Sequence, residues 1–295
     1  MRIGANTIDQ RSPCFVIAEI GVNHDGDGDR CIELIEAAAT AGADAVKLQL
    51  FRAELLLSKA ARLAEYQRDA GETDPFAMLQ RLELNEEAMQ SAIERSHALG
   101  LSAIASIFSL ESVDTAERLG FNAYKTASPD IVNRPLLEAL MATGKPMIVS
   151  TGTASIEEIR ESSSWIVSAD AVYLHCVSAY PTPDNEASLQ AMSAVKDASG
   201  RNVVGYSDHT TSEFTGAVAA GAGAKVLEKH LSYNRSAPGP DHAASLDPDG
   251  LARYISNVRI AESMLGDADK TCRAIEGEVR SASRQSIVAA RQLPP

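Results

Sequence analysis

Two histidines and two lysines stand where they could share one binding site. His209 and His230 each lie near the end of an apolar run, and Lys47 and Lys125 interrupt two other apolar runs. Two imidazoles that leave coordination positions open suit a divalent transition metal. Two fixed cations suit a phosphate or a carboxylate. The four residues therefore indicate a site that binds an anion beside a metal ion.

Further polar residues stand near the same ends of the apolar runs. Glu19 could serve as an acid, a base or a metal partner. Gln49 follows Lys47 by two positions, so both side chains face the same side of a strand. Asp208 could orient a metal ligand or cap a helix, and His175 could be functional or structural. The remaining polar residues at these ends include Ser106, Ser128, Ser150, Ser178, Tyr180, Ser207, Glu228 and Lys229.

Eight short apolar runs alternate with amphipathic helical patterns, which predicts a (β/α)₈ barrel of the α/β class. Chemistry in such barrels lies at the carboxyl ends of the strands, where these polar residues would meet. An open doubly wound sheet is the alternative, but Gly-x-Gly-x-x-Gly does not follow the first strand. The predicted strands span residues 15–20, 45–50, 101–107, 122–127, 146–151, 172–178, 202–207 and 225–231.

The chain divides into three parts around this pattern. Residues 1–13 are predicted to form a hairpin that closes the barrel bottom, 14–268 the barrel, and 269–295 a C-terminal tail. Residues 52–85 form a long segment after the second strand, and a long loop at that end of a barrel is usually functional.

The composition limits the classes of partner. The 295 residues are 45% hydrophobic and carry a formal charge of −13, which argues against general binding to nucleic acid or membrane surfaces. The four cysteines are widely spaced, so we expect reduced thiols and no zinc site or disulfide frame. We find no signal-peptide pattern and no apolar stretch of membrane-spanning length, and we expect a cytoplasmic protein.

Several longer motifs occur in order along the chain, and together they resemble the sialic acid synthase family. Those enzymes condense phosphoenolpyruvate with an N-acetylmannosamine-type sugar. The resemblance extends from about residue 13 to about residue 268. The motifs are AEIGVNHDGD (18–27), GADAVKLQLF (42–51), YKTASPD (124–130), VSTGTAS (149–155), LHCVSAYPTP (174–183), GYSDHT (205–210) and EKHLS (228–232) with GPDHAASLDP (239–248).

This resemblance implies a role for each matching residue. The fold would be a (β/α)₈ barrel with an N-terminal hairpin. His209 and His230 would hold a divalent cation, typically Mn²⁺ with Co²⁺, Zn²⁺ or Mg²⁺ as alternatives, and Glu19 would act in catalysis with them. Phosphoenolpyruvate would contact Lys47, Ser106, Lys125, Ser128, Ser150, Ser178 and Ser207. The sugar would contact Gln49, Asp130, Tyr180 and Asp241.

The chain departs from the family pattern in three places. The third strand contains ASIFS (105–109) where the family usually has Ser-Thr-Pro-Phe, and Ser178 replaces a usual asparagine. Family members also continue into an antifreeze-like domain, which reaches across a homodimer to the sugar. We expect that domain to be missing here or supplied separately. Arg235 or the 52–85 segment could take over its contact with the sugar.

Three other functions remain open from the residues. The same chemistry could act on another aldose, giving a pseudaminic, legionaminic or deaminated sialic acid. Lys125 could instead form a Schiff base in an aldolase, which requires a desolvated lysine. The chain could also be a non-catalytic sugar-binding relative.

Overall fold

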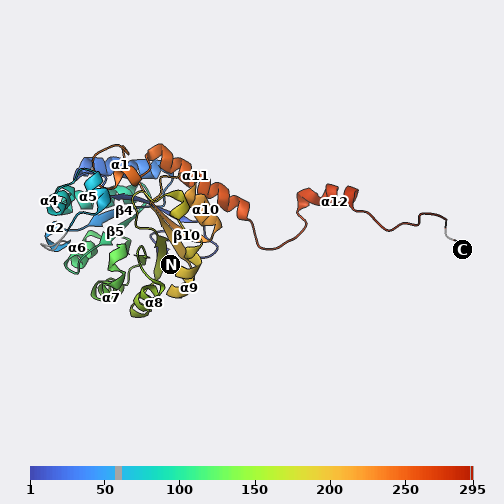
Figure 1. Ribbon diagram of the computed structural model, residues 1–295, viewed down its shortest axis with the longest axis horizontal. Coiled ribbons are helices and arrows are strands. Elements are labelled where there is room, and N and C mark those ends of the chain that lie inside the picture. Colours follow the sequence, from blue (N-terminus) through green and yellow to red (C-terminus); the bar gives the residue numbers. More distant parts are fainter. Residues whose placement is uncertain (57–61, 293, 295) are drawn as a thin grey trace. The chain divides into compact units, whose positions relative to one another are not determined.

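The barrel predicted from the sequence is confirmed. The computed structural model describes residues 1–56, 62–292 and 294. Eight parallel strands form a closed barrel in the order β10-β3-β4-β5-β6-β7-β8-β9, and helices surround it (Figure 1). The chain separates into two compact units, Met1–Met264 and Leu265–Pro295.

The strands begin and end within two residues of the predicted runs. Their mostly apolar outer faces are buried by helices, and the buried pair of Asp208 and Lys229 is a polar exception. They are β3 (Phe15–Gly21), β4 (Ala45–Leu50), β5 (Ser102–Ile107), β6 (Ala123–Thr126), β7 (Met147–Ser150), β8 (Ala171–Cys176), β9 (Val204–Asp208) and β10 (Ala224–His230).

The barrel helices follow local signals in the sequence. Ser155 and Glu158 form a capping box at the start of α8, and Gly42 ends α1 in the left-handed conformation with φ of 87°. The helices are α1 (Gly28–Ala41), α5 (Glu86–Ala98), α6 (Glu111–Leu119), α7 (Arg134–Ala142), α8 (Ile156–Trp165), α9 (Ala191–Ser199), α10 (Thr215–Gly221) and α11 (Pro248–Leu265).

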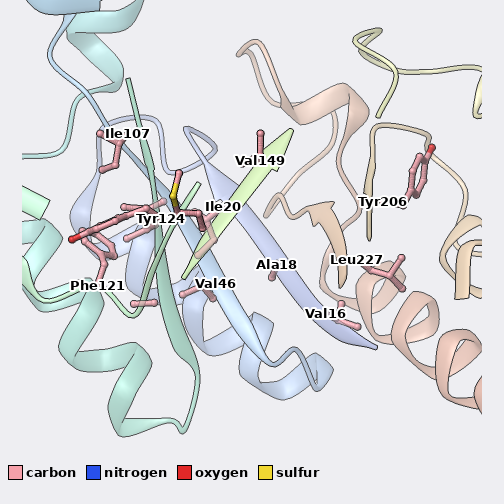
Figure 2. Close-up of a cluster of buried hydrophobic side chains, with 14 of the residues drawn as sticks. Val16, Ala18, Ile20, Val46, Ile107, Phe121, Tyr124, Val149, Tyr206 and Leu227 are labelled. Atoms are coloured by element: carbon pink, nitrogen blue, oxygen red, sulfur yellow. The ribbon is translucent and has the colours of Figure 1, made fainter. Parts of the chain in front are cut away.

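Two apolar layers hold the barrel together. The larger layer fills the space between strands and helices, and Figure 2 shows part of it, including Val46 of β4 and Leu227 of β10. The smaller layer fills the barrel interior at its amino-terminal end. There Ile3 and Ile8, in and after the two-stranded sheet of β1 (Arg2–Ile3) and β2 (Asn6–Thr7), join the inward side chains of the strands. Polar residues line the carboxyl-terminal end of the barrel interior.

The long segment between β4 and β5 has its own structure. It contains α2 (Ala53–Leu56), α3 (Glu65–Asp69) and α4 (Pro75–Leu82), and residues 57–61 of the predicted 52–85 segment lie outside the description. A third, small apolar cluster includes Met78 and Leu82 of α4. We call α2, α3 and α4 together the β4–β5 insertion.

The remaining elements are short. Three 3₁₀ helices follow barrel strands: η1 (Ser128–Val132), η2 (Asp184–Glu186) and η3 (His242–Ala244). The second unit contains η4 (Ala274–Glu276) and α12 (Gly277–Ser283). Across the described residues, helices long and apolar enough to cross a membrane are absent.

Candidate active site

A cavity of about 360 Å³ opens at the carboxyl ends of the strands, where the sequence places the site. It brings together all but one of the predicted site residues. Asp130 is the exception: it lies in η1 outside the lining, and its carboxylate accepts a hydrogen bond from Asn133 Nδ2 at 3.3 Å. The predicted residues that line the cavity are Glu19, Lys47, Gln49, Ser106, Lys125, Ser128, Ser150, Ser178, Tyr180, Ser207, His209, His230 and Asp241.

Lys47 is the centre of a buried charge network. Its Nζ lies 2.8 Å from Glu19 Oε2 and 3.9 Å from Glu228 Oε2, and it donates to Ser106 Oγ at 2.7 Å. Gln49 Nε2 donates to Glu19 Oε1 at 3.2 Å. Parallel register produces this arrangement, because Glu19 of β3 pairs with Lys47 of β4. The two polar residues that interrupt β4 thus both contact the same carboxylate.

The two carboxylates of this network have opposite pKa shifts. Burial raises the pKa of Glu19 to about 7, although Lys47 opposes the shift. For Glu228, burial also raises the pKa, but Lys47 and Lys125 together outweigh it and the net pKa is lowered. Separated pKa values in one site are typical of acid–base chemistry, because one carboxyl can carry a proton beside another that stays charged. Glu19 is therefore the group suited to moving a proton near neutral pH.

The second lysine, Lys125, lies on β6, where Ser106 of β5 pairs with it. Lys125 Nζ donates to the Thr126 carbonyl oxygen at 2.8 Å and also to Ser150 Oγ. Burial lowers the pKa of Lys125, Glu228 raises it, and the net shift is downward. Two ammonium groups and several hydroxyls around one space can bind an anion such as a phosphate.

Gly152 allows close packing of three side chains near the end of β7. Its backbone N–H donates to Ser128 Oγ at 3.1 Å. A Cβ atom at position 152 would lie 2.2 Å from Ser178 Oγ, 2.7 Å from Ser128 Oγ and 3.0 Å from Cys176 Sγ. The missing Cβ lets these two hydroxyls and the thiol pack directly against the backbone of residue 152. Cys176 itself is buried.

The two histidines come from neighbouring strands and lie close together. Their ring centroids are 5.6 Å apart. His209 Nδ1 donates to the Val177 carbonyl oxygen at 2.7 Å, so Nε2 carries the lone pair of the ring, with Ser207 Oγ 3.5 Å away. His230 Nδ1 is buried without a hydrogen-bond partner in the described residues, and Asp241 Oδ2 is 3.7 Å from it. Burial lowers the pKa of both imidazoles, which favours their neutral, ligating form.

These donors fit a divalent cation with open positions. In the part of the chain that the structure describes, no three His, Cys, Asp or Glu side chains are arranged to enclose an ion. Two imidazole nitrogens would therefore leave most coordination positions to water or substrate oxygen atoms, as in catalytic sites. A buried, unpartnered nitrogen on His230 beside a carboxylate is consistent with that use.

Aromatic rings border the histidines. The Tyr180 ring centroid lies 4.2 Å from that of His209 and 6.0 Å from that of His230. Tyr66 of α3 stacks on Tyr180 with a centroid distance of 5.0 Å. The β4–β5 insertion thus reaches the cavity through Tyr66 and the adjacent Gln67, both of which line it.

The structure shows where three residues lie for which the sequence left more than one role open. His175 lies outside the lining, stacks on Tyr206 and bonds the Ala187 carbonyl oxygen through Nε2 at 3.1 Å, so it is structural. Asp208 does not face the cavity either: it lies 3.1 Å from Lys229 Nζ and accepts from the Thr210 backbone N–H. Arg235, the alternative contact for the sugar, lines a separate surface hollow.

Glu228 is the main site residue to which sequence reasoning assigned no role. Its signal was present, because it precedes His230 by two positions and so shares its inward face. Ser207 Oγ donates to Glu228 Oε1 at 2.8 Å, which fixes the carboxylate between the two lysines. A carboxylate among anion-binding cations is not expected from charge alone, and only the packing of β9 against β10 shows it.

Comparison with known proteins identifies the family of this chain. The NeuB family model matches residues 34–270. The chain belongs to the NeuB family. It is 37% identical over 289 residues to an N,N'-diacetyllegionaminic acid synthase of Legionella pneumophila, covering 95% of this chain and 81% of that protein. It is 30% identical over 285 residues to a human N-acetylneuraminate-9-phosphate synthase, covering 96% and 79%.

Solved structures agree with this assignment. The crystal structure of an N-acetylneuraminic acid synthetase from Leptospira borgpetersenii, in complex with citrate, superposes with a TM-score of 0.85 at 29% sequence identity. The alignment covers 97% of this chain and 98% of that one. The resemblance noted from the motifs is therefore confirmed, and this NeuB-family chain is an enzyme of the synthase type.

Proposed function

We propose that this NeuB-family enzyme condenses phosphoenolpyruvate with the open-chain aldehyde of N-acetylmannosamine or a related aldose, giving a nonulosonic acid and phosphate. The observation that carries the proposal is the convergence of two buried lysines, a carboxylate with a raised pKa and two neutral histidines on one cavity. The named activities of the relatives support the same reaction class.

Phosphoenolpyruvate would occupy the lysine end of the cavity. Its phosphate and carboxylate carry several negative charges, which Lys47 and Lys125 offset together with hydroxyl donors. Gly152 allows the hydroxyls of Ser128 and Ser178, which line the cavity, to lie close together as donors for one of these groups. Local positive charge explains how a chain of net charge −13 binds an anion.

His209 and His230 would hold a divalent cation, Mn²⁺ in the first instance. Such an ion supplies Lewis-acid polarisation of a carbonyl oxygen. The residues themselves would orient the acceptor: Tyr180 packs beside both imidazoles, and Asp241 Oδ2 lies 3.7 Å from His230 Nδ1. The aldehyde would therefore be presented at the histidine end, facing the enol.

The reaction forms one carbon–carbon bond and breaks one carbon–oxygen bond. C3 of phosphoenolpyruvate attacks the aldehyde carbon, whose oxygen takes up a proton. Positive charge develops at C2, water adds there, and the C2–O bond to phosphate breaks. Glu19 is the carboxyl positioned to stabilise that charge or to accept the proton of the water, because its pKa lies near neutrality.

A Schiff-base aldolase is the second candidate, since burial lowers the pKa of Lys125 and would expose a neutral amine. Its ammonium donates to the Thr126 carbonyl oxygen and to Ser150 Oγ, an arrangement that holds a charged group. Reduction with borohydride in the presence of pyruvate separates the two, because only the aldolase would gain a covalent adduct on Lys125.

The test is aldose-dependent release of phosphate from phosphoenolpyruvate. We expect release with at least one N-acylated aldose in the presence of Mn²⁺ and loss of activity with a chelator. Lys125→Met should abolish release, whereas Lys145→Met, at a half-buried lysine outside the cavity, should not. Chelator-resistant turnover, or no release with any aldose, would refute the proposal.

A further inference from the structure

A buried ion pair joins the residues that directly precede the two histidines. Asp208 and Lys229 are completely buried, and Asp208 Oδ2 lies 3.1 Å from Lys229 Nζ. The two residues are also partners in the register of β9 and β10. We call them the β9–β10 ion pair. Neither residue lines the cavity, so the pair has no direct part in the proposed chemistry.

The ion pair lies on the outer side of the barrel strands. Asp208 and Lys229 each stand between two residues that line the cavity, and side chains alternate between the two faces of a strand. Lys229 Nζ is 5.3 Å from the centroid of the Tyr254 ring of α11. Helices α10 and α11 lie on this side of the barrel (Figure 1). The layer between strands and helices is otherwise mainly apolar, so two buried charges there require an explanation.

Stability alone does not explain a buried ion pair. The attraction between the two charges does little more than offset the cost of removing both from water, and apolar side chains of similar size often stabilise a protein equally well. In some proteins a buried polar contact instead selects one geometry. The contacts of the β9–β10 ion pair show which geometry it could select here.

The ion pair binds the backbone next to His209. Lys229 Nζ donates to the Thr210 carbonyl oxygen at 2.6 Å, and Asp208 Oδ1 accepts from the Thr210 backbone N–H at 2.9 Å. His209 itself lies one residue beyond the end of β9, where the strand pairing with β10 stops. The ion pair thus ties the residues on both sides of His209 to β10.

His230 is held by regular backbone pairing. It is the last residue of β10 and pairs with Glu19 in the register of β10 and β3. Its carbonyl oxygen also accepts from the Leu246 backbone N–H at 2.9 Å. A firm connection between the segment 208–210 and β10 therefore sets the separation of the two imidazoles, whose ring centroids are 5.6 Å apart.

We propose that Asp208 and Lys229 are positioning residues, which hold His209 at the distance from His230 that lets both imidazoles reach one divalent cation. Ligands on different strands bind an ion tightly when their geometry is fixed before the ion arrives. This inference rests on the proposed function, because it takes His209 and His230 as the metal ligands.

The first experiment measures Mn²⁺ binding by Lys229→Met. This change breaks the ion pair and removes the donor to the Thr210 carbonyl oxygen. Calorimetry with Mn²⁺ alone should show an affinity weakened about 10- to 100-fold, the range typical of losing a group that orients a metal ligand. Saturating Mn²⁺ should restore most of kcat, and the KM for phosphoenolpyruvate should not change, because Lys47 and Lys125 are untouched.

A double variant separates geometry from stability. Asp208→Asn/Lys229→Met removes both charges but keeps a side-chain oxygen at position 208 for the Thr210 backbone N–H. It leaves no unpaired buried charge, so thermal unfolding should show a more stable protein than Lys229→Met. Its Mn²⁺ affinity should remain as weak, since the donor to the Thr210 carbonyl oxygen is still missing. The double variant also carries the test if Lys229→Met does not fold.

Arg259→Met is the matched control at the amino-terminal end of the strands. Arg259 lies 3.1 Å from Asp44 Oδ2 and donates to the Cys14 carbonyl oxygen at 2.8 Å. It therefore also joins a carboxylate to a backbone carbonyl group, just before β3 and β4 begin. Its loss should lower stability and leave the Mn²⁺ affinity unchanged.

The outcomes separate this inference from the proposed function. Wild-type affinity for Mn²⁺ in Lys229→Met, or an affinity that recovers together with stability in the double variant, overturns the positioning role while the condensation itself stands. An equal loss of affinity in Arg259→Met also overturns it, because any destabilisation would then have the same effect. A wild-type enzyme that does not bind Mn²⁺ refutes the metal site of the proposed function, and the inference with it.

Discussion

Replacing Lys47 by methionine removes the ammonium from the buried network but keeps the length of the side chain. Glu19 then loses its partner at 2.8 Å, and truncating one member of a buried ion pair costs about 3–5 kcal/mol of unfolding free energy. The variant can reduce this cost by leaving Glu19 protonated, because burial already raises its pKa. The destabilisation should therefore depend on pH.

The sign follows from proton linkage. Glu19 has a folded-state pKa above its unfolded value, so the native state binds more protons and the free energy of unfolding falls as pH rises through this range. Without Lys47 the pKa rises further. If native Lys47→Met holds one more proton on Glu19 than the unfolded chain from pH 6 to pH 8, its free energy of unfolding falls by about 2.7 kcal/mol over that range. This fall is roughly twice the one that Glu19 causes in the wild type.

Urea unfolding at pH 6 and pH 8 measures this difference. The double variant Glu19→Gln/Lys47→Met lacks the titrating carboxyl and should recover most of the stability lost at pH 8. Lys145→Met is the matched control, because Lys145 pairs with Glu117 at 3.0 Å on the surface and its loss should cost less than about 1 kcal/mol at either pH. A Lys47→Met variant as stable as wild type at pH 8, or equally destabilised at both pH values, would refute the reasoning.

Three further changes probe other parts of the molecule. Gly152→Ala inserts a Cβ among hydroxyls 2.2–2.7 Å away and should raise the KM for phosphoenolpyruvate at least about 10-fold with the sugar KM unchanged; equal effects on both would contradict the assigned place of the anion. His209→Gln should abolish metal-dependent activity and weaken Mn²⁺ binding in calorimetry, while the control His175→Gln should keep both. If His209→Gln still binds Mn²⁺ as the wild type does, His209 is not a metal ligand. Burial lowers the pKa of His24 to about 4, below its unfolded value, so protons favour the unfolded state as pH falls. Wild type should lose about 2 kcal/mol through this group between pH 7 and pH 5, and His24→Gln should show a correspondingly smaller pH dependence in urea unfolding.

The sequence predicts the barrel well because its signals are local. Each strand is a short apolar run, and the polar residues in those runs are conspicuous where branched apolar side chains are expected. Lys47 and Gln49 illustrate this, since their spacing of two places both on the inner face, where both contact Glu19. His209, which directly follows β9, and His230, which ends β10, are predicted to meet because adjacent parallel strands end at the same edge of the barrel.

Other features depend on packing between distant segments. Asp130 follows its strand like the other site residues, but the 3₁₀ helix η1 turns it toward Asn133 and away from the cavity lining. The role of Glu228 becomes apparent only from its position next to Ser207 and the two lysines. The place of Met78, Leu79 and Leu82 in the cavity lining depends on how the β4–β5 insertion folds against the barrel. Apolar residues in a long segment do not reveal which surface they cover.

The most direct test of the central claim is to follow which product receives the bridging oxygen of phosphoenolpyruvate. The proposed condensation adds water at C2 and breaks the C2–O bond, so ¹⁸O placed in the C–O–P bridge should leave entirely with the released phosphate when Mn²⁺ and the aldose are present. Retention of the label in the keto acid product, or label release that does not require an aldose, would contradict the account.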